Sequence, residues 1–500
     1  MASTTDCSWS AGSARSSRPG TTSRRAVAAT VRTAGRTVVY SAATVAAALA
    51  ALLAFPVYFL RSFAYAGIPV VAITALAAVV ALPAAFRLLG RRLRGRPPRH
   101  RSEAGRFWER LAARVTRHPV RFAIPVLVVL AVLAVPAAGV SFGLPDDRAV
   151  GADHSGARRV GDVLRSDFST RPSEAVLVVL PDPGDGVPAP EGDFAAYASR
   201  LSGLDRVLRV EAPDGTFVHG ERVGPGPDGL RRGRAAALRV VPDGLAYDPA
   251  TQDLVRAVRE VPAGRATLVG GPTARFLDVN TAIGSRLPLV GALIALTTLL
   301  VVFFFTGSVW LPIKALVVNA ATIAAVLGAM VWVFQDGHGA DLLGVTPLPL
   351  SVSIPPLMFC LAFGLSMDYE VFLLGRIKEH HDAGLDNASA VAAGLATTGR
   401  IVTAAAALMA VTFLAFVTSR VGFVQMLGLG CALAVLLDAT LVRGVLVPAL
   451  MRLMGSWNWW APAALVRLHD RIAPHNARPR SARAALNPTP ARQTHERTRS

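Results

Sequence analysis

The chain has 500 residues, 52% of them hydrophobic, and a mean hydropathy of +0.44. These values are typical of a protein with many membrane spans and exclude an ordinary soluble domain. The formal net charge of +19 comes almost entirely from arginine, because only Lys314 and Lys378 are lysines. With three cysteines and no metal-ligand spacing, the sequence indicates no disulfide framework, and we expect no cofactor, no metal site and no enzymatic activity.

The apolar stretches predict eight transmembrane helices. Most of them have about the 20 residues that a helix needs to cross a bilayer. They run over Val38–Leu60, Ser62–Leu89, Phe122–Phe142, Leu287–Phe305, Leu311–Phe334, Ser351–Leu374, Ile401–Val417 and Val421–Leu450. The predicted fold class is therefore an α-helical polytopic membrane protein.

A basic linker follows the second span. Twelve arginines and only two acidic residues, Glu103 and Glu109, lie between Arg87 and Arg121. An excess of arginine beside apolar spans marks a cytoplasmic loop, which explains the basic charge better than nucleic-acid binding does. Because the number of spans is even, we expect both termini to be cytoplasmic and the protein to lie in the cytoplasmic membrane.

The segment between the third and fourth spans differs from the rest. It is polar and rich in proline and glycine, and its strand patterns alternate with helix patterns. The strands are predicted at Glu174–Leu180, Ala235–Val241 and Ala266–Gly271, and the helices at Phe194–Leu204 and Thr251–Val261. This alternation predicts a small ferredoxin-like α+β domain outside the membrane.

The predicted organisation follows from these segments. Residues 26–90 hold two transmembrane helices, and residues 91–121 form the basic linker. The third span occupies 122–142, the extracytoplasmic domain 143–285, a five-helix bundle 286–456 and a basic cytoplasmic tail 457–500.

An ionisable pair lies in the sixth span. The stretch Leu357–Glu379 reads LMFCLAFGLSMDYEVFLLGRIKE, with Asp368 and Tyr369 well inside the apolar part. An acidic residue at that depth costs about 2.5–3.5 kcal/mol on insertion scales. Asp368 is therefore a functional candidate, although a neighbouring helix could also hold it in a purely structural role.

Two other polar residues are candidates for supporting this pair. Ser366 could form a hydrogen bond across helices. Asp438 lies deep in the last span and could be either a structural hydrogen-bonding residue or part of a relay. Arg443 follows Asp438 by five residues, which is a poor spacing for a same-face pair on an α-helix.

The chain contains an internal repeat. AVAATVRTAGR at Ala26–Arg36 matches AVAAGLATTGR at Ala390–Arg400, at an offset of 364 residues. LPAAFRLLG at Leu82–Gly90 likewise matches VPALMRLMG at Val447–Gly455. The first two spans therefore repeat as the last two, and repeated helical halves are common in transporters.

The last third of the chain resembles a known family. GLSMDYEVFLLGRIKE, LLDATLVRGVLVPALMRLMG and WNWWAP resemble the C-terminal half of MMPL transporters of the RND superfamily, and the resemblance extends over about Ala26–Pro462. It implies export of lipids or hydrophobic small molecules driven by the proton motive force, with Asp368 and Tyr369 in the proton relay. It also implies that residues 143–285 form a porter domain.

The chain departs from the family plan of twelve spans and two porter domains. This sequence has no counterpart of three parts of that plan: the first four spans, the first porter domain and a partner Asp-Tyr pair. The implied partners are protons, membrane lipids and a lipid cargo, together with a second copy or a partner chain that supplies the missing half. Two alternatives remain open: a non-transporting membrane sensor or interaction protein, and a non-functional gene fragment.

Residues 1–25 are rich in serine, threonine, arginine and glycine, a composition typical of disorder. The repeat offset places Thr4 and Thr5 opposite Asp368 and Tyr369. When the reading frame is shifted by one nucleotide, the codons of Ser3–Asp6 permit Asp-Tyr-Gly. We therefore expect this segment to be a frameshift product, with a genuine disordered tail as the alternative.

Overall fold

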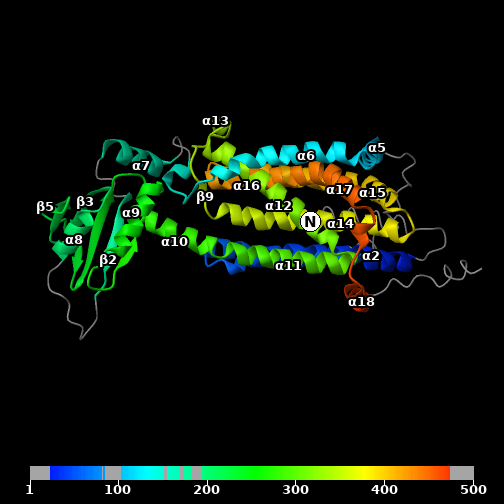
Figure 1. Cartoon of the computed structure of the whole chain (residues 1–500), viewed down its shortest axis with the longest axis horizontal. Helices are drawn as coiled ribbons and strands as arrows, with labels where there is room; N and C mark the ends of the chain where they lie inside the picture. The colour runs from blue at the N-terminus through cyan, green and yellow to red at the C-terminus, as the bar shows by residue number, and fades with distance from the viewer. Residues whose placement is uncertain are drawn as a thin grey trace, which may run out of the picture.

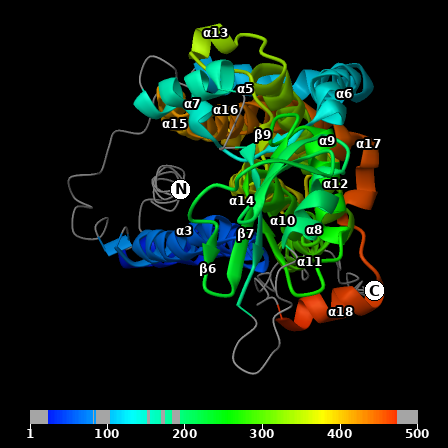
Figure 2. The ribbon, with the colours of Figure 1, turned by 90° about the vertical axis from the view of Figure 1, so that its left-hand side faces the viewer.

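The computed structural model describes residues 23–81, 83–84, 103–150, 155–168, 174–182 and 194–472. Within these ranges, eight helices are long and apolar enough to cross a membrane, which confirms the predicted polytopic class. The helices form an elongated bundle, and a domain built around a β-sheet extends from one end of it (Figure 1). Figure 2 shows the molecule with this domain toward the viewer. The proposed relay counterparts Thr4 and Thr5 lie outside the described residues.

The first two spans are separated earlier than predicted. The first comprises α2 (Ser23–Ala51) and a short 3₁₀ turn, and the second begins with α3 (Tyr58–Leu76). The break falls before Pro56, because the residue preceding a proline disfavours the helical conformation; Phe55 is extended. Arg61, predicted to lie at the break, is in the first turn of α3 and donates from Nε to the Phe55 carbonyl at 2.7 Å. The prediction of a break at Arg61 was wrong.

The N-terminal end of α2 also differs from expectation. This helix begins at Ser23, so the last three residues of the segment expected to be disordered are helical. The repeat segments Ala26–Arg36 and Ala390–Arg400 both lie in helices, α2 and α15 (Asn387–Val417).

The basic linker leads into the third span through an amphipathic helix. Its helix α5 (Glu103–Arg117) is followed at once by α6 (Pro119–Ala134), which a 3₁₀ turn extends to Gly139. Strand β1 (Phe142–Gly143) then pairs in parallel with β9 (Leu350–Ser351). This pair ties the sheet-domain end of the third span to the sheet-domain end of the sixth.

The sheet domain has the ferredoxin-like topology that the sequence predicts. Its core strands lie in the order β8-β2-β7-β3, and every neighbouring pair is antiparallel. Helices α8 (Phe194–Ser202) and α9 (Pro249–Glu260) pack their apolar residues against one face. The strands are β2 (Val176–Leu180), β3 (Val207–Ala212), β7 (Ala235–Pro242) and β8 (Leu268–Gly270).

Four described strands of this domain escaped the sequence prediction. In β3 a register shift between Val207 and Arg209 breaks the alternation of apolar and polar residues on which that prediction depends. The others are short and polar or rich in glycine: β4 (Gly215–Val218), β5 (Glu221–Gly224) and β6 (Arg231–Arg232). Such strands give little periodicity.

Two helices connect this domain to the bundle. Helix α7 (Gly156–Asp167) lies beside the sheet domain, near the adjacent ends of the spans (Figure 1). Helix α10 (Pro272–Gly284) leaves the sheet and leads into α11 (Leu287–Thr306), and the two run almost end to end (Figure 1). The helical connection thus begins at Pro272, before the predicted start of the fourth span at Leu287.

The remaining spans surround α14 (Ile354–Asp382). They are α12 (Trp310–Met330), which a π-helical turn extends to Gln335, α15 and α16 (Gly422–Leu437). The short α13 (Ala340–Leu343) lies in the loop before α14, at the sheet-domain end of the bundle. Helices α14 and α15 both extend past the predicted spans and meet at a tight turn, where Gly384 has a φ of +98°. At Gly328 of α12, the lack of a side chain lets the Leu133 carbonyl at the end of α6 lie against the helix backbone.

The last span is not a continuous α-helix. A π-helical segment, η8 (Asp438–Leu446), separates α16 from α17 (Val447–Met454). A 3₁₀ turn (Gly455–Trp459) and α18 (Ala463–Ile472) follow, so part of the predicted tail is helical.

Candidate functional site

Asp368 lies near the middle of α14, which has the largest buried share of the eight candidate spans, 72%. Its carboxylate accepts a hydrogen bond from the hydroxyl of Ser41, a buried residue of α2. Sequence reasoning missed Ser41, although a serine followed by Thr44 is a polar signal in an apolar span.

Tyr369 faces a different side of α14, because adjacent residues of a helix do not share a face. Its buried ring packs against α15 and the last span, in a cluster with Val402, Ala405, Ala406, Val435 and Ala439. Its hydroxyl donates to the sulfur of Met409 at 2.9 Å. Asp368 and Tyr369 therefore contact different neighbours: Asp368 contacts α2, and Tyr369 contacts α15 and the last span.

A buried polar cluster joins three spans beside this pair. The Ser366 hydroxyl donates to Asn319 of α12 at 2.5 Å and lies 3.1 Å from an Asp438 oxygen. Arg443 donates from Nε to Asp438 at 2.6 Å and from Nη2 to the Ser366 carbonyl. The structure thus brings Ser366 and Asp438 together, one turn from Tyr369.

The contact between Asp438 and Arg443 contradicts the sequence interpretation, which judged a spacing of five residues unsuitable. The reason is the π-helical segment η8, in which the repeat is i to i+5 rather than i to i+4. The two side chains then lie on one face and form an ion pair whose partners are 3% and 5% exposed. The Arg443 guanidinium also lies 5.6 Å from the centre of the Tyr369 ring.

Two further buried charged residues were not singled out from the sequence. Lys314 of α12 and Glu370 of α14 are 7% and 5% exposed. Lys314 Nζ and Glu370 Oε1 have no hydrogen-bond partner among the residues that the structure describes. The signals were present, since Lys314 is one of two lysines and Glu370 follows Tyr369 directly.

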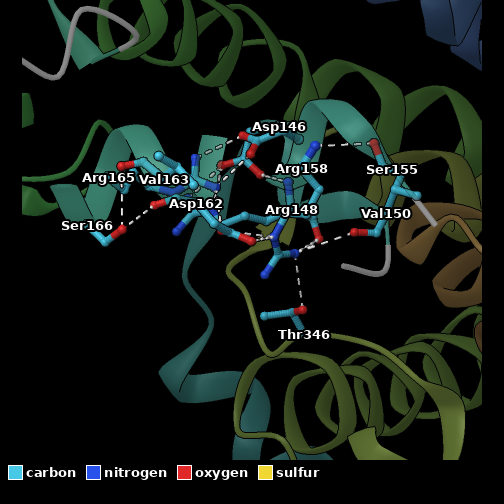
Figure 3. A network of polar contacts seen from close by, with 11 residues as sticks. Asp146, Arg148, Val150, Ser155, Arg158, Asp162, Val163, Arg165, Ser166 and Thr346 are labelled. Carbon is cyan, nitrogen blue, oxygen red and sulfur yellow. Dashed lines mark hydrogen bonds and ion pairs between the residues drawn. The ribbon is translucent and has the colours of Figure 1, made fainter. Parts of the chain in front are cut away.

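A second polar network lies beside the bundle, where α7 meets loops at its sheet-domain end (Figure 3). The buried Arg158 of α7 bonds to Asp162 at 2.8 Å, to the Arg148 carbonyl at 3.1 Å and to the Thr346 hydroxyl at 3.3 Å. Thr346 belongs to the loop before α14, so one guanidinium ties the sheet-domain segment to the bundle. A β-bridge between Val150 and Val421 reinforces this junction.

The same network contains an ion pair between Arg165 and Asp147, at 2.6 Å. The hydrogen bond from Arg165 holds the pKa of Asp147 below its ordinary value. The ion pair therefore stabilises the fold fully when the pH is above the ordinary pKa of an aspartate. This stabilisation is lost as the pH falls through the lowered pKa of Asp147.

A mostly apolar cavity of about 60 Å³ adjoins the junction. Apolar side chains from the sheet-domain ends of two spans line it, including Phe334, Phe423 and Met426. Tyr247 of the sheet domain covers it from outside, and burial raises the pKa of this tyrosine to about 12. The cavity therefore lies between the bundle and the sheet domain.

The sequence of this chain matches the model of a known protein family. The family model described as MMPL family matches residues 15–122 and 231–482, more than half of the chain. The chain belongs to the MMPL family. The resemblance inferred from the DYEVFLLGRIKE region is thereby confirmed, and the second matched segment holds Asp368 and the polar cluster of this MMPL chain.

Relatives of this MMPL chain are named as membrane proteins and lipid exporters. A membrane protein of Streptomyces coelicolor is 38% identical over 93% of the chain and 62% of its own length. The trehalose monomycolate exporter MmpL3 of Mycobacterium tuberculosis is 33% identical over 89% of the chain and 50% of its own length. The mycolic acid-containing lipids exporter MmpL11 of Mycolicibacterium smegmatis is 33% identical over 91% and 46%. The chain spans about half the length of the two exporters.

Among solved structures, the fold of this MMPL chain is similar to the hedgehog release protein Disp from the water bear Hypsibius dujardini. The TM-score is 0.63 at 15% identity, over 90% of the chain and 62% of Disp. At this identity the similarity concerns the fold alone.

Proposed function

We propose that the chain drives the export of lipids or other hydrophobic small molecules with the proton motive force, or forms the proton-coupled part of a protein that does so. The observation that carries the proposal is the difference between two buried acids. Asp438 has a permanent counter-charge, Arg443, whereas the described hydrogen-bond partner of Asp368 is the neutral hydroxyl of Ser41. A buried charge is costly unless it is paired. Asp438 therefore suits a fixed ion pair, and Asp368 suits a group that gains and loses a proton.

Two observations support a lipid cargo. The relatives named as exporters act on trehalose monomycolate and on mycolic acid-containing lipids. The cavity below Tyr247 is lined mostly by apolar side chains, as an acyl chain would require.

The proposed coupling starts at the contact between α14 and α2. Loss of a proton from Asp368 places a charge beside Ser41 and changes the relative free energies of two packings of these helices. At its outer end α14 follows β9, whose partner β1 leads into the sheet domain. The Arg158–Thr346 contact and the α10–α11 connection give two further routes to the same domain.

The proposed orientation places the sheet domain outside the cytoplasmic membrane and both termini inside. Cysteine labelling tests it, in a background from which the native cysteines are removed. Leu342→Cys, at a position 92% exposed in the outer loop, should react with an impermeant maleimide on intact cells. Asp382→Cys, at the other end of α14, should react only after lysis; the reverse pattern would contradict the orientation.

Transport itself is tested with the purified full chain in liposomes that contain a lipid with a fluorescent headgroup. We expect an imposed pH gradient to speed the movement of this lipid between leaflets, and a protonophore to abolish the effect. A rate equal to that of protein-free liposomes would contradict transport by this chain alone and favour the sensor or fragment alternatives.

A further inference from the structure

Helix α5 covers the end of the bundle opposite the sheet domain (Figure 1). Its apolar face is inserted between the spans: Trp108 is 8% exposed, and Ala112 and Val115 are fully buried. The preceding residue, Phe107, points outward and is 58% exposed. One aromatic residue of α5 thus contacts the bundle interior while its neighbour does not.

The indole of Trp108 lies in a slot formed by two glycines. Gly399 of α15 lies under the ring so closely that a Cβ there would overlap the indole carbons. Gly444 of η8 lies at the ring edge, where a Cβ would be 3.4 Å from Cζ3, an ordinary contact. The ring can occupy the slot only because residue 399 has no side chain.

A cavity of about 10 Å³ lies against the ring. This is close to the roughly 10–15 Å³ that one water molecule needs. Two polar groups line it: Arg443, whose Nη1 has no hydrogen-bond partner among the described residues, and Thr398, whose hydroxyl donates to the Gly394 carbonyl at 2.8 Å.

The other side of this cavity borders residues that pack against Tyr369. Val402 and Ala439 line it, and both also pack against Tyr369. Leu373, one turn after Tyr369 on α14, completes that wall. The cavity therefore separates Tyr369 and Arg443 from the amphipathic helix on the proposed cytoplasmic side.

We propose that Trp108 is a gate between the Asp368–Tyr369 site and the cytoplasm. With the indole in the glycine slot, the ring forms one wall of this small cavity and narrows access to it. When the indole leaves, the cavity joins the cytoplasmic water and gives Arg443 and Tyr369 a path for protons. The gate rests on the proposed relay for its role, but its opening can be measured without transport.

Cysteine accessibility tests the gate in the full chain, held in lipid nanodiscs. Ala439→Cys is introduced after Cys7, Cys360 and Cys431 are replaced, and its reaction with a small cationic methanethiosulfonate is followed. If the open state is normally populated at about 0.1–10%, Trp108→Ala should raise the reaction rate about tenfold or more. The matched control Phe107→Ala should leave the rate unchanged.

A pair of glycine variants displaces the ring without removing it. Gly399→Ala should expel the indole and raise the rate, whereas Gly444→Ala should not. Trp108→Phe, which keeps an aromatic ring, should restore most of the protection. Unchanged rates in both Trp108→Ala and Gly399→Ala would overturn the gate, as would an equal rise in all variants. Raised rates in a chain that fails the liposome assay would support the gate while contradicting the transport function.

Discussion

Replacement of Arg443 by methionine should destabilise the folded bundle by about 3–5 kcal/mol, the usual cost of leaving one partner of a buried ion pair alone. Arg443 and Asp438 are almost completely buried, and the guanidinium also bonds to the Ser366 carbonyl. Without it, the Asp438 carboxylate loses its ion-pair partner and two spans lose a connection. Reversible unfolding in mixed micelles, followed by circular dichroism, measures the change in the free energy of unfolding.

The double variant Arg443→Met with Asp438→Leu separates an ion-pair effect from a packing effect. Removal of both charges should recover most of the lost stability, because apolar pairs of similar volume often replace buried ion pairs without net cost. Arg452→Met is the control, since Arg452 lies exposed on α17; it should change stability by less than about 0.5 kcal/mol. A double variant no more stable than Arg443→Met would show that the ion pair is not the cause.

The Asp438–Arg443 pair also illustrates what the sequence could not predict. The number of spans and the ferredoxin-like domain were predictable, because span length and strand alternation are local properties of the chain. No comparable local sequence pattern marks a π-helical segment. Its presence changes which side chains share a face, so a spacing rule for α-helices gave the wrong result at Arg443.

The candidate site was only partly predictable from the sequence. Asp368, Tyr369, Ser366 and Asp438 are conspicuous because polar residues inside apolar spans are rare. Their partners were not, since Ser41 and Asn319 reach them from helices distant in sequence. The role of Gly399 was equally hidden in the sequence, because it depends on which ring lies against this glycine.

Asp368→Asn should reduce lipid movement driven by the pH gradient to the rate of protein-free liposomes. Asparagine has nearly the same shape and can still accept a hydrogen bond from Ser41, but it cannot bind and release a proton in this range. The variant should therefore insert and fold like the wild type, which membrane fractionation and the melting temperature check. Asp382→Asn, an exposed change at the end of the same helix, is the matched control and should transport normally.

Variants of Ser41 extend the test to the contact that the structure reveals. Ser41→Ala removes a hydrogen bond to Asp368, and such bonds to charged groups contribute about 1.5–3 kcal/mol. Because this bond holds α2 to α14 in one of the two proposed packings, its loss should shift the pH dependence of transport rather than abolish transport. Thr44→Ala, one turn along α2, breaks only a local bond to the Ser41 carbonyl and should leave that dependence unchanged. If Asp368→Asn retained wild-type transport, Asp368 would be a structural residue, and the proton would have to use another buried acid, with Glu370 the nearest on α14.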